Sequence, residues 1–265
     1  MYIDSHCHLN HERIQGEGDP SSIVRLAKQN KVDGMLTICC RIAEEFDGIL
    51  NIARANDNVW CSIGTHPHDA GLQTEKDISL DKLIALANSD PKVIGIGESG
   101  LDYFYDHSPR ADQQDSFRKH IRACLATGLP LIVHSRDAEE DTMKIIREEN
   151  PDGKLTGVMH CFSSKRKLAE DALDIGFYVS FSGIITFKKS TELQDIAKDV
   201  PLDKLLIETD APFLAPEPYR GKTNTPAYVG HTCDYLAKLK DISGEDMAAI
   251  TKGNFFRLFT KAKLT

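Results

Sequence analysis

The feature that most constrains the fold is a regular alternation of short apolar segments with amphipathic helical patterns along all 265 residues. Eight segments are rich in β-branched residues, and most are continuous apolar runs, as expected for parallel strands that are buried on both faces. These predicted strands lie at residues 2–4, 34–38, 59–63, 93–96, 131–133, 155–159, 177–181 and 205–207.

Helical patterns fill the intervals between the predicted strands. The apolar positions of 80–87 share one helix face, and a second stripe in 117–125 ends before Gly128 and Pro130. Eight βα units in roughly 250 residues have the size of a (β/α)₈ barrel, whose active site lies at the carboxyl ends of the strands. An open, doubly wound sheet is the rival fold.

The pattern also bears on the domain organisation. No linker rich in Pro, Gly or Ser interrupts the alternation, so we predict a single domain over residues 1–265. Residues 233–259 have the pattern of two further helices, which we expect to pack on the outside of the barrel.

Potential metal ligands come at the ends of several predicted strands. In an extended strand alternate side chains share a face, so His6 and His8 can hold one metal ion while Cys7 points the other way. If the fold is a barrel, the ligand-type residues after the later strands meet these two at one mouth. They are His66 and His68 after the third strand, Glu98 after the fourth, His134 after the fifth, His160 after the sixth and Asp210 after the eighth.

Imidazole and carboxylate ligands without paired thiols suit Zn²⁺, Mn²⁺ or a similar divalent ion. Six ligands exceed what one tetrahedral ion needs, so we predict two metal ions with Glu98 as the bridging ligand. Paired ions can hold the attacking and the leaving oxygen of a displacement reaction. The predicted ligands are His6, His8, Asp210 and Glu98 for one ion, and His134, His160 and Glu98 for the other.

A glycine-rich motif around Glu98 has the form of a dinucleotide-binding fingerprint. Residues 95–100 match G-x-G-x-x-G after a predicted strand. The residues that follow do not open an amphipathic helix, and the turn would place Glu98 against a pyrophosphate. We therefore expect these glycines to let the backbone approach the metal centre closely instead.

The charge distribution limits the partners. A net charge of −8 argues against a protein that covers long duplex DNA with a basic face, but it permits a small anionic substrate. Arg136 follows His134 at the predicted mouth, where its planar guanidinium suits a phosphate oxygen. Tyr103, Phe104 and Phe162 are candidates either for stacking on a base or for packing at the rim. Further loop cations are residues 165–167, Lys188, Lys189, Arg220 and Lys222.

Cysteine usage and hydropathy indicate the compartment. The seven cysteines include no C-x-x-C pair, which indicates reduced thiols and not a disulfide framework. The first residues lack the pattern of a signal peptide, and nowhere do 18 apolar residues run together. We therefore expect a cytoplasmic protein without a membrane partner.

Seven short motifs fall in order along essentially the whole chain: DSHCHL at 4–9, GTHPH at 64–68, GESGLDY at 97–103, HSR at 134–136, HCFS at 160–163, ETDAP at 208–212 and GNFFRLF at 253–259. As a set they resemble the TatD family of metal-dependent deoxyribonucleases, within the amidohydrolase-like barrels. The resemblance implies a (β/α)₈ barrel with two divalent ions and hydrolysis of DNA phosphodiesters supported by Mg²⁺ or Mn²⁺. It also implies that Asp210 acts as a base toward water and that His66 and Arg136 contact phosphate.

The leading hypothesis is therefore a deoxyribonuclease that acts on single-stranded DNA or on strand ends. A hydrolase of an amide, lactone or phosphotriester on the same barrel is the alternative, but its phosphotriesterase-like relatives carry a bridging lysine where this chain has Glu98. A third hypothesis is a non-enzymatic metal-binding partner protein, which a complete ligand set argues against. The oligomeric state is left open. The predicted catalytic residues are Asp210, Glu98, Arg136 and His66.

Overall fold

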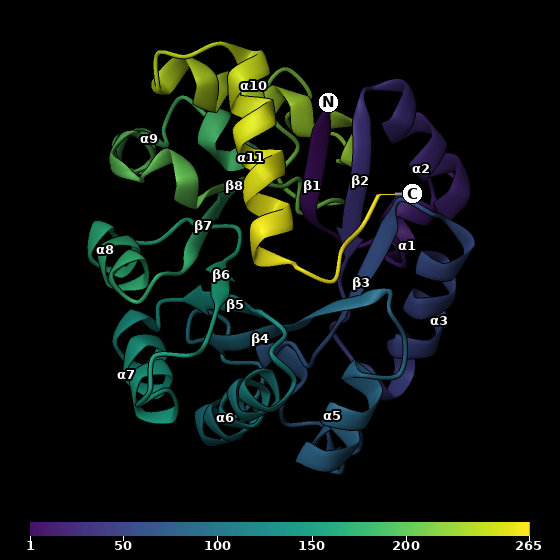
Figure 1. Cartoon of the computed structure of the whole chain (residues 1–265), viewed down its shortest axis with the longest axis vertical. Helices are drawn as coiled ribbons and strands as arrows, with labels where there is room; N and C mark the ends of the chain where they lie inside the picture. The colour runs from purple at the N-terminus through teal and green to yellow at the C-terminus, as the bar shows by residue number, and fades with distance from the viewer. Residues whose placement is uncertain (265) are drawn as a thin grey trace.

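The computed structural model describes residues 1–264 and contains an eight-stranded parallel sheet surrounded by helices (Figure 1). Each strand pairs with the next one in chain order, and a bridge between Cys7 and Ala211 joins the first strand to the segment after the last. The predicted (β/α)₈ barrel is confirmed, and the open sheet is excluded. The strands are β1 (Tyr2–Cys7), β2 (Val32–Thr37), β3 (Val59–Ile63), β4 (Val93–Asp102), β5 (Leu131–Arg136), β6 (Gly157–Met159), β7 (Tyr178–Phe181) and β8 (Leu205–Ile207).

Local sequence sets several helix ends. The Asp19 carboxylate accepts the Ser22 N–H at the start of α2, and the Ser79 hydroxyl accepts the Lys82 N–H at the start of α5. Gly128 ends α6 in the left-handed conformation, as its sequence predicts. The helices are α1 (Glu12–Gln15), α2 (Pro20–Gln29), α3 (Ile42–Ala55), α4 (Gln73–Lys76), α5 (Leu80–Ala87), α6 (Arg110–Thr127), α7 (Glu139–Glu149), α8 (Arg166–Asp174), α9 (Thr191–Asp199), α10 (Val229–Leu239) and α11 (Gly244–Leu258), with 3₁₀ turns η1 (Pro67–Asp69), η2 (Gly183–Thr186), η3 (Leu202–Lys204) and η4 (Pro226–Tyr228).

The buried apolar side chains form two clusters. The larger cluster combines strand residues with residues of the surrounding helices. The smaller cluster takes at least one residue from every strand, so it fills the interior of the barrel. Its strand members are Ile3, Leu36, Trp60, Ile94, Ile132, Val158, Tyr178 and Leu206.

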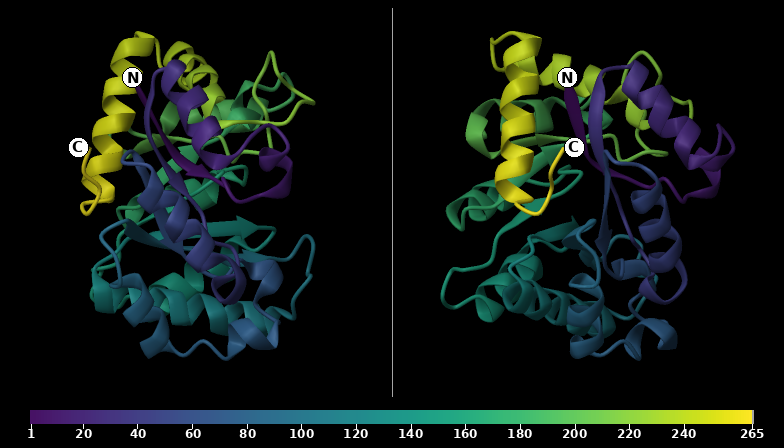
Figure 2. Two further views of the ribbon diagram at one scale, coloured as in Figure 1. Left: turned by 90° about the vertical axis from the view of Figure 1, so that its right-hand side faces the viewer. Right: turned by 45° about the vertical axis from the view of Figure 1, so that its right-hand side comes forward.

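The two predicted C-terminal helices are present, but only α10 lies wholly on the outside. Phe255 and Phe259 at the end of α11 belong to the interior cluster, and a Cβ added to Gly95 would lie 3.1 Å from the Phe259 ring. Helix α11 therefore covers the amino-terminal end of the barrel, on the opposite side from the loop after β8 (Figure 2). The expectation of purely external packing is wrong here because these aromatic rings complete the interior.

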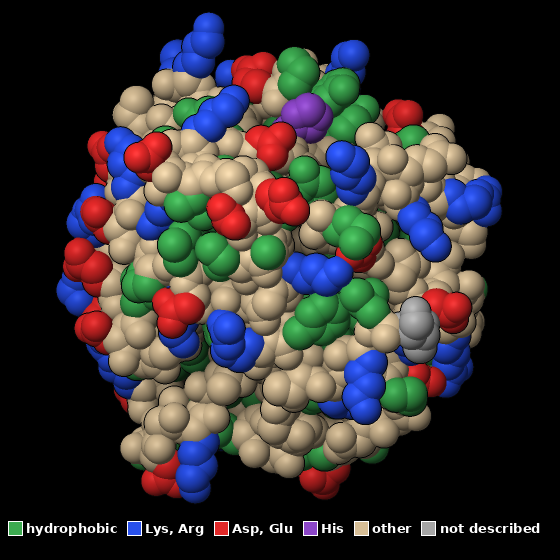
Figure 3. Space-filling view, turned by 45° about the horizontal axis from the view of Figure 1, so that its top comes forward, with side chains coloured by type: hydrophobic (Ala, Val, Ile, Leu, Met, Phe, Trp, Pro, Cys, Tyr) green, Lys and Arg blue, Asp and Glu red, His purple; other side chains and the backbone are tan. Residues whose placement is uncertain are grey.

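Figure 3 shows Lys and Arg side chains interspersed with Asp and Glu on the face it presents, with no continuous basic area among the described residues there. Within residues 1–264, none of the helices combines the length and the apolar character needed to cross a membrane.

The buried His120 of α6 gives the fold a defined pH dependence. Its Nδ1–H donates to the Ser116 carbonyl oxygen at 2.7 Å, and its Nε2 accepts the Thr65 N–H at 3.0 Å. Burial lowers the pKa of His120 from 6.5 to about 4. The unfolded chain thus binds a proton between these two values while the folded chain does not, so acidification favours unfolding.

We expect His120 alone to reduce the free energy of unfolding by about 3 kcal/mol as the pH falls from 6.5 to 4. A His120→Gln variant can retain both hydrogen bonds but has no titrating ring, so its stability should decline less over this interval. Urea unfolding of both proteins at several pH values measures the difference. Parallel pH profiles for the two proteins would contradict the assignment.

Candidate metal centre

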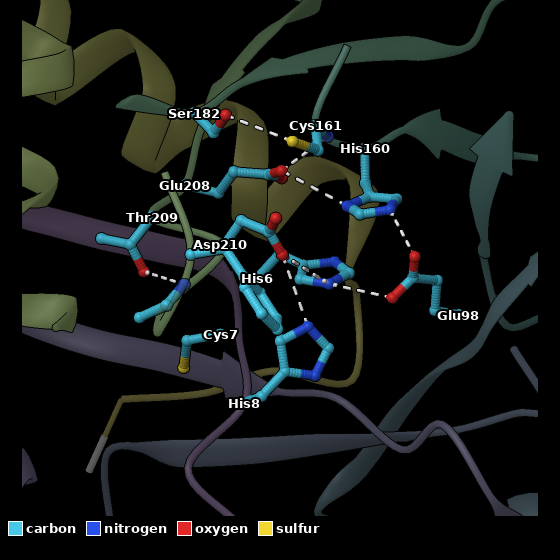
Figure 4. Close-up of polar contacts among 12 residues, drawn as sticks. His6, Cys7, His8, Glu98, His160, Cys161, Ser182, Glu208, Thr209 and Asp210 are labelled. Atoms are coloured by element: carbon cyan, nitrogen blue, oxygen red, sulfur yellow. Dashed lines mark hydrogen bonds and ion pairs between the residues drawn. The ribbon is translucent and has the colours of Figure 1, made fainter. Parts of the chain in front are cut away.

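The predicted ligands lie together at the carboxyl ends of the strands. Three strands extend further than predicted, so His6, Glu98 and His134 lie within β1, β4 and β5. His8, His160 and Asp210 directly follow β1, β6 and β8 or come within a few residues of them. Figure 4 shows His6, His8, Glu98, His160 and Asp210 converging on one another.

Glu98 stands at the centre of this cluster. Its Oε1 lies 2.7 Å from His160 Nε2, 2.8 Å from His134 Nδ1 and 3.3 Å from His66 Nε2. Its Oε2 lies 3.3 Å from His6 Nε2. The two oxygens of this carboxylate thus face different imidazoles, three at Oε1 and that of His6 at Oε2.

A second carboxylate completes the side of the cluster formed by β1. Asp210 Oδ1 lies 3.4 Å from His8 Nε2 and 3.7 Å from His6 Nε2. The Asp210 N–H donates to the His6 carbonyl oxygen at 2.9 Å, which fixes the segment after β8 against β1. His6, His8 and Asp210 therefore form one set of potential ligands whose donor atoms lie within 4.8 Å of one another.

The remaining sets all share Glu98. One consists of His66, Glu98 and His134, and another of His6, Glu98 and His160. The predicted second ion on His134, His160 and Glu98 is not among these sets, although both imidazoles contact the same oxygen. Among residues 1–264, the geometry thus brings all six predicted ligands together and adds His66.

The chemistry of these donors fits a divalent cation. His6 is fully buried, and neither of its ring nitrogens has a hydrogen-bond partner among the described residues. Burial, reinforced by the neighbouring His160, lowers the pKa of His6, so the ring is neutral and its lone pair is free. A buried imidazole without partners is unfavourable unless a ligand satisfies it, and a metal ion does so.

The carboxylates are ionised. Burial acts to raise the pKa of Glu98, but His160 and His66 outweigh it and lower the pKa well below the usual range. Burial likewise acts to raise the pKa of Asp210, but hydrogen bonding to His8 and the proximity of His6 lower it. The cluster thus offers two carboxylates and five imidazoles, which are donor groups that suit a divalent ion.

Two further carboxylates orient the histidines, and the sequence analysis assigned them no role. Glu208 Oε1 accepts the Cys161 N–H at 2.6 Å and lies 3.4 Å from His160 Nδ1. Asp102 Oδ2 lies 3.2 Å from His134 Nε2 and 2.9 Å from His68 Nε2. Carboxylates that hold the far nitrogen of a ligating histidine fix its tautomer and its direction. Asp102 lies in the motif at 97–103 and Glu208 in the motif at 208–212, and nothing else in the sequence indicates their role.

His66 and Arg136 lie beside the ligands. The His68 N–H donates to His66 Nδ1 at 3.1 Å, so the proton of the neutral ring is on Nε2. Burial lowers the pKa of His66 to about 4, which keeps the ring neutral at pH 7. The Arg136 guanidinium lies 4.0 Å from the centre of the Phe104 ring, and it forms no ion pair within residues 1–264.

A cavity adjoins the cluster on the side of β1 and β2. Its volume is about 500 Å³. Cys40 lies in its wall, with Sγ 3.7 Å from His8 Nδ1, and is one of the donors near Glu98. A single cysteine has no spacing pattern, so the sequence alone does not indicate this contact. The residues that line the cavity are His8, Asn10, His11, Glu12, Cys40, Arg41 and Glu45.

The remaining residues singled out from the sequence are aromatic residues, loop cations and cysteines. Phe162 is buried, and the Tyr103 ring is covered by Arg110 while its hydroxyl donates to Asp141. Phe104 also has a guanidinium against its ring, that of Arg136, but it is 55% exposed. Among the loop cations, Arg166 and Lys167 pair with carboxylates. Lys188 and Lys189 form no ion pair with the described residues. All seven cysteines are free, as predicted.

The glycines of β4 act as expected, since they lie inside the strand and not between a strand and a helix. A Cβ on Gly100 would lie 1.9 Å from the His134 carbonyl oxygen, and one on Gly97 would lie 2.4 Å from that of Ile132. Both have positive φ, at 152° and 133°. Glycine at these positions lets β5 approach β4 and places His134 against Glu98.

We expect Gly100→Ala to lower the free energy of unfolding by at least about 2 kcal/mol, because the added methyl group overlaps backbone. Gly253→Ala is the matched control. A Cβ at this helical position meets nothing within 4 Å, so alanine should stabilise by about 0.5–1 kcal/mol. Urea unfolding measures both variants, and a Gly100→Ala protein as stable as the parent would contradict the steric argument.

Together, the barrel and the site are those of a metal-dependent hydrolase, since imidazoles and carboxylates form candidate metal-binding groups at the carboxyl mouth of a (β/α)₈ barrel. The family model TatD related DNase matches residues 3–260. The chain belongs to the TatD family of metal-dependent hydrolases.

Individual relatives agree with this assignment. The uncharacterized metal-dependent hydrolase YcfH of Escherichia coli K12 is 41% identical over 266 residues, which cover 97% of this chain and 95% of the relative. The 3′-5′ ssDNA/RNA exonuclease TatD of Cronobacter turicensis is 34% identical over 259 residues, covering 96% of each. Among solved structures, the TatD homologue YJJV of Escherichia coli K12 matches with a TM-score of 0.88 and 26% identity over 98% of both chains.

Proposed function

We propose that this hydrolase cleaves phosphodiester bonds of DNA, as an exonuclease on single strands or frayed ends. The observation that carries the proposal is the Glu98 carboxylate, whose Oε1 faces three histidines while its Oε2 faces His6. Arg136 follows His134 on the same strand and forms no ion pair with the described residues. The similarity to a relative named as a 3′-5′ ssDNA/RNA exonuclease supports the same substrate class. A mouth whose cations lie on a few short loops, on a chain of net charge −8, suits a single strand better than a duplex.

Two divalent ions, Mg²⁺ or Mn²⁺ with Zn²⁺ as a further possibility, would lower the pKa of a water molecule and neutralise charge on the phosphate. The residues that would hold them are His6, His8, Glu98, His134, His160 and Asp210.

The protein groups around the ions have distinct roles in this proposal. Asp210 keeps 13% of its side chain exposed, against 4% for Glu98, so it is placed to accept the proton of the attacking water. His66 donates its Nε2–H to a phosphate oxygen, and Arg136 offers a second, charged donor. We further infer that residues 1–265 act as one domain, since α11 returns to pack on β1 and β8.

The test is digestion of 5′- and 3′-labelled single-stranded oligonucleotides by protein stripped with a chelator and reloaded with one metal at a time. We expect cleavage only after reloading, in single-nucleotide steps from one end. A lactone and a dipeptide serve as comparison substrates for the alternative hydrolase activities. Faster turnover of either one, or cleavage that survives removal of the metal, would overturn the proposal.

A further inference from the structure

The turn after β4 carries two aromatic rings that the protein leaves largely uncovered. Phe104 is 55% exposed and Tyr105 is 48% exposed, and their ring centres are 4.9 Å apart with the planes nearly perpendicular. Adjacent exposed aromatic rings beside a candidate site provide faces on which a planar ligand can stack. We call Phe104 and Tyr105 the aromatic platform.

The aromatic platform is fixed to the metal centre by one carboxylate. Asp102 Oδ1 accepts the N–H of Phe104 at 3.1 Å and that of Tyr105 at 2.9 Å. Its Oδ2 contacts His134 and His68. The position of the two rings is therefore tied to that of a predicted metal ligand through a single side chain, so the platform is rigidly placed beside the site.

Arg136, the predicted phosphate contact, lies against both rings of the platform. Its guanidinium carbon lies 4.0 Å from the centre of the Phe104 ring and 4.7 Å from that of Tyr105. No carboxylate of the described residues pairs with this cation, although many other arginines of the chain form ion pairs. Cation–π contacts hold the guanidinium in place and leave its N–H groups free for an anion.

We propose that the aromatic platform stacks against the base of the nucleotide whose phosphate contacts Arg136. This inference rests on the proposed function and adds a substrate requirement, namely a base next to the bond that is cleaved. An aromatic face beside an unpaired guanidinium matches the base and the phosphate of one nucleotide. Stacking tolerates any base because every base has a π-face, so the platform confers no strong sequence preference.

The platform is the best placed of the aromatic groups near the site. Phe213, on the opposite side near His8 and His11, is 39% exposed and packs edge-on against these two rings. Tyr105 is stacked on His107 at 5.3 Å, so Phe104 offers the more open face of the pair. We therefore assign the principal contact with the base to Phe104.

The test combines Phe104→Ala with an abasic substrate. Metal-loaded proteins are compared on a short single-stranded DNA and on the same DNA with an abasic terminal nucleotide, placed in turn at each end. We expect Phe104→Ala to lower kcat/KM on normal DNA by roughly 5- to 100-fold, mainly through KM. The abasic nucleotide should lower kcat/KM of the parent protein by a similar factor, with little further loss in Phe104→Ala.

Two additional variants separate stacking from simple apolar contact. Phe104→Trp keeps a π-face and should restore kcat/KM on normal DNA, whereas Phe104→Leu keeps apolar volume alone and should not. The stacking inference would be overturned if Phe104→Ala lowers kcat/KM by the same factor on normal and on abasic DNA. It would also be overturned if Phe104→Ala causes no loss of kcat/KM on normal DNA. If the parent protein retains its metal but cleaves neither DNA, the proposed function itself fails, and the two failures are thereby distinguished.

Discussion

Replacement of Glu98 by glutamine is expected to weaken metal binding and to lower kcat/KM on the order of 10³-fold. Glutamine is neutral, so the substitution removes the negative charge that lies between His6 and His160. The NH₂ group of glutamine cannot coordinate a cation. Metal content after dialysis, measured by mass spectrometry, should fall below that of the parent protein. Addition of Mn²⁺ should raise the melting temperature of the parent but not of Glu98→Gln, a readout that is independent of activity.

Glu75→Gln is the matched control for this substitution. The two carboxyl residues are equally buried, at 2% and 3% exposure, but Glu75 accepts the N–H groups of Ile42 and Ala43 at the start of α3. Its loss should destabilise the fold by about 1–3 kcal/mol and leave the metal content unchanged. Full metal content and full activity in Glu98→Gln would refute the assignment of Glu98 as bridging ligand.

Replacement of Asp210 by asparagine is expected to lower kcat by about 10²- to 10⁴-fold, because the amide cannot accept a proton from water. The side chain keeps one oxygen toward His6 and His8, so part of the metal content should survive. The carboxylate of the parent protein is ionised above its lowered pKa. In the parent protein kcat should therefore decline on acidification as the Asp210 carboxylate becomes protonated. The pH profile of kcat for Asp210→Asn should lack this decline.

Asp241→Asn controls for the chemical change and for the backbone. Asp241 has φ of 54°, close to the 55° of Asp210, but it lies exposed after α10 and away from the site. Its substitution should leave kcat unaffected. If Asp210→Asn retains the parent kcat with its metal content preserved, Asp210 is a ligand only and another group is the base.

The sequence predicted the secondary structure well because burial on both faces leaves a plain signal. Each of the eight predicted strands is present, since parallel strands inside a layer of helices must be continuously apolar. The interior of the barrel was harder to predict. Phe255 and Phe259 have the spacing of one helix face, and that spacing reports a buried face without saying which neighbour covers it.

The candidate site likewise combines features that the sequence predicted with features that it did not. The sequence placed His6, His8, Glu98, His134 and Asp210 at strand ends, where a parallel barrel must bring them together. It did not reveal that Asp102 ties Phe104 and Tyr105 to His134, or that Cys40 lies against His8. The contacts of Asp102 with His134 and of Cys40 with His8 each join residues 32 apart in the chain, and they exist only once neighbouring strands are paired.

The sequence by itself therefore determined the alternation of strands and helices and supplied the candidate ligand residues, because hydrophobic periodicity and residue type are local properties. The tertiary structure alone decided which imidazoles face each oxygen of Glu98, which carboxylates orient them and which rings remain uncovered. The physical reason is that strand register and loop packing fix distances between side chains, and no local pattern in the chain encodes a distance.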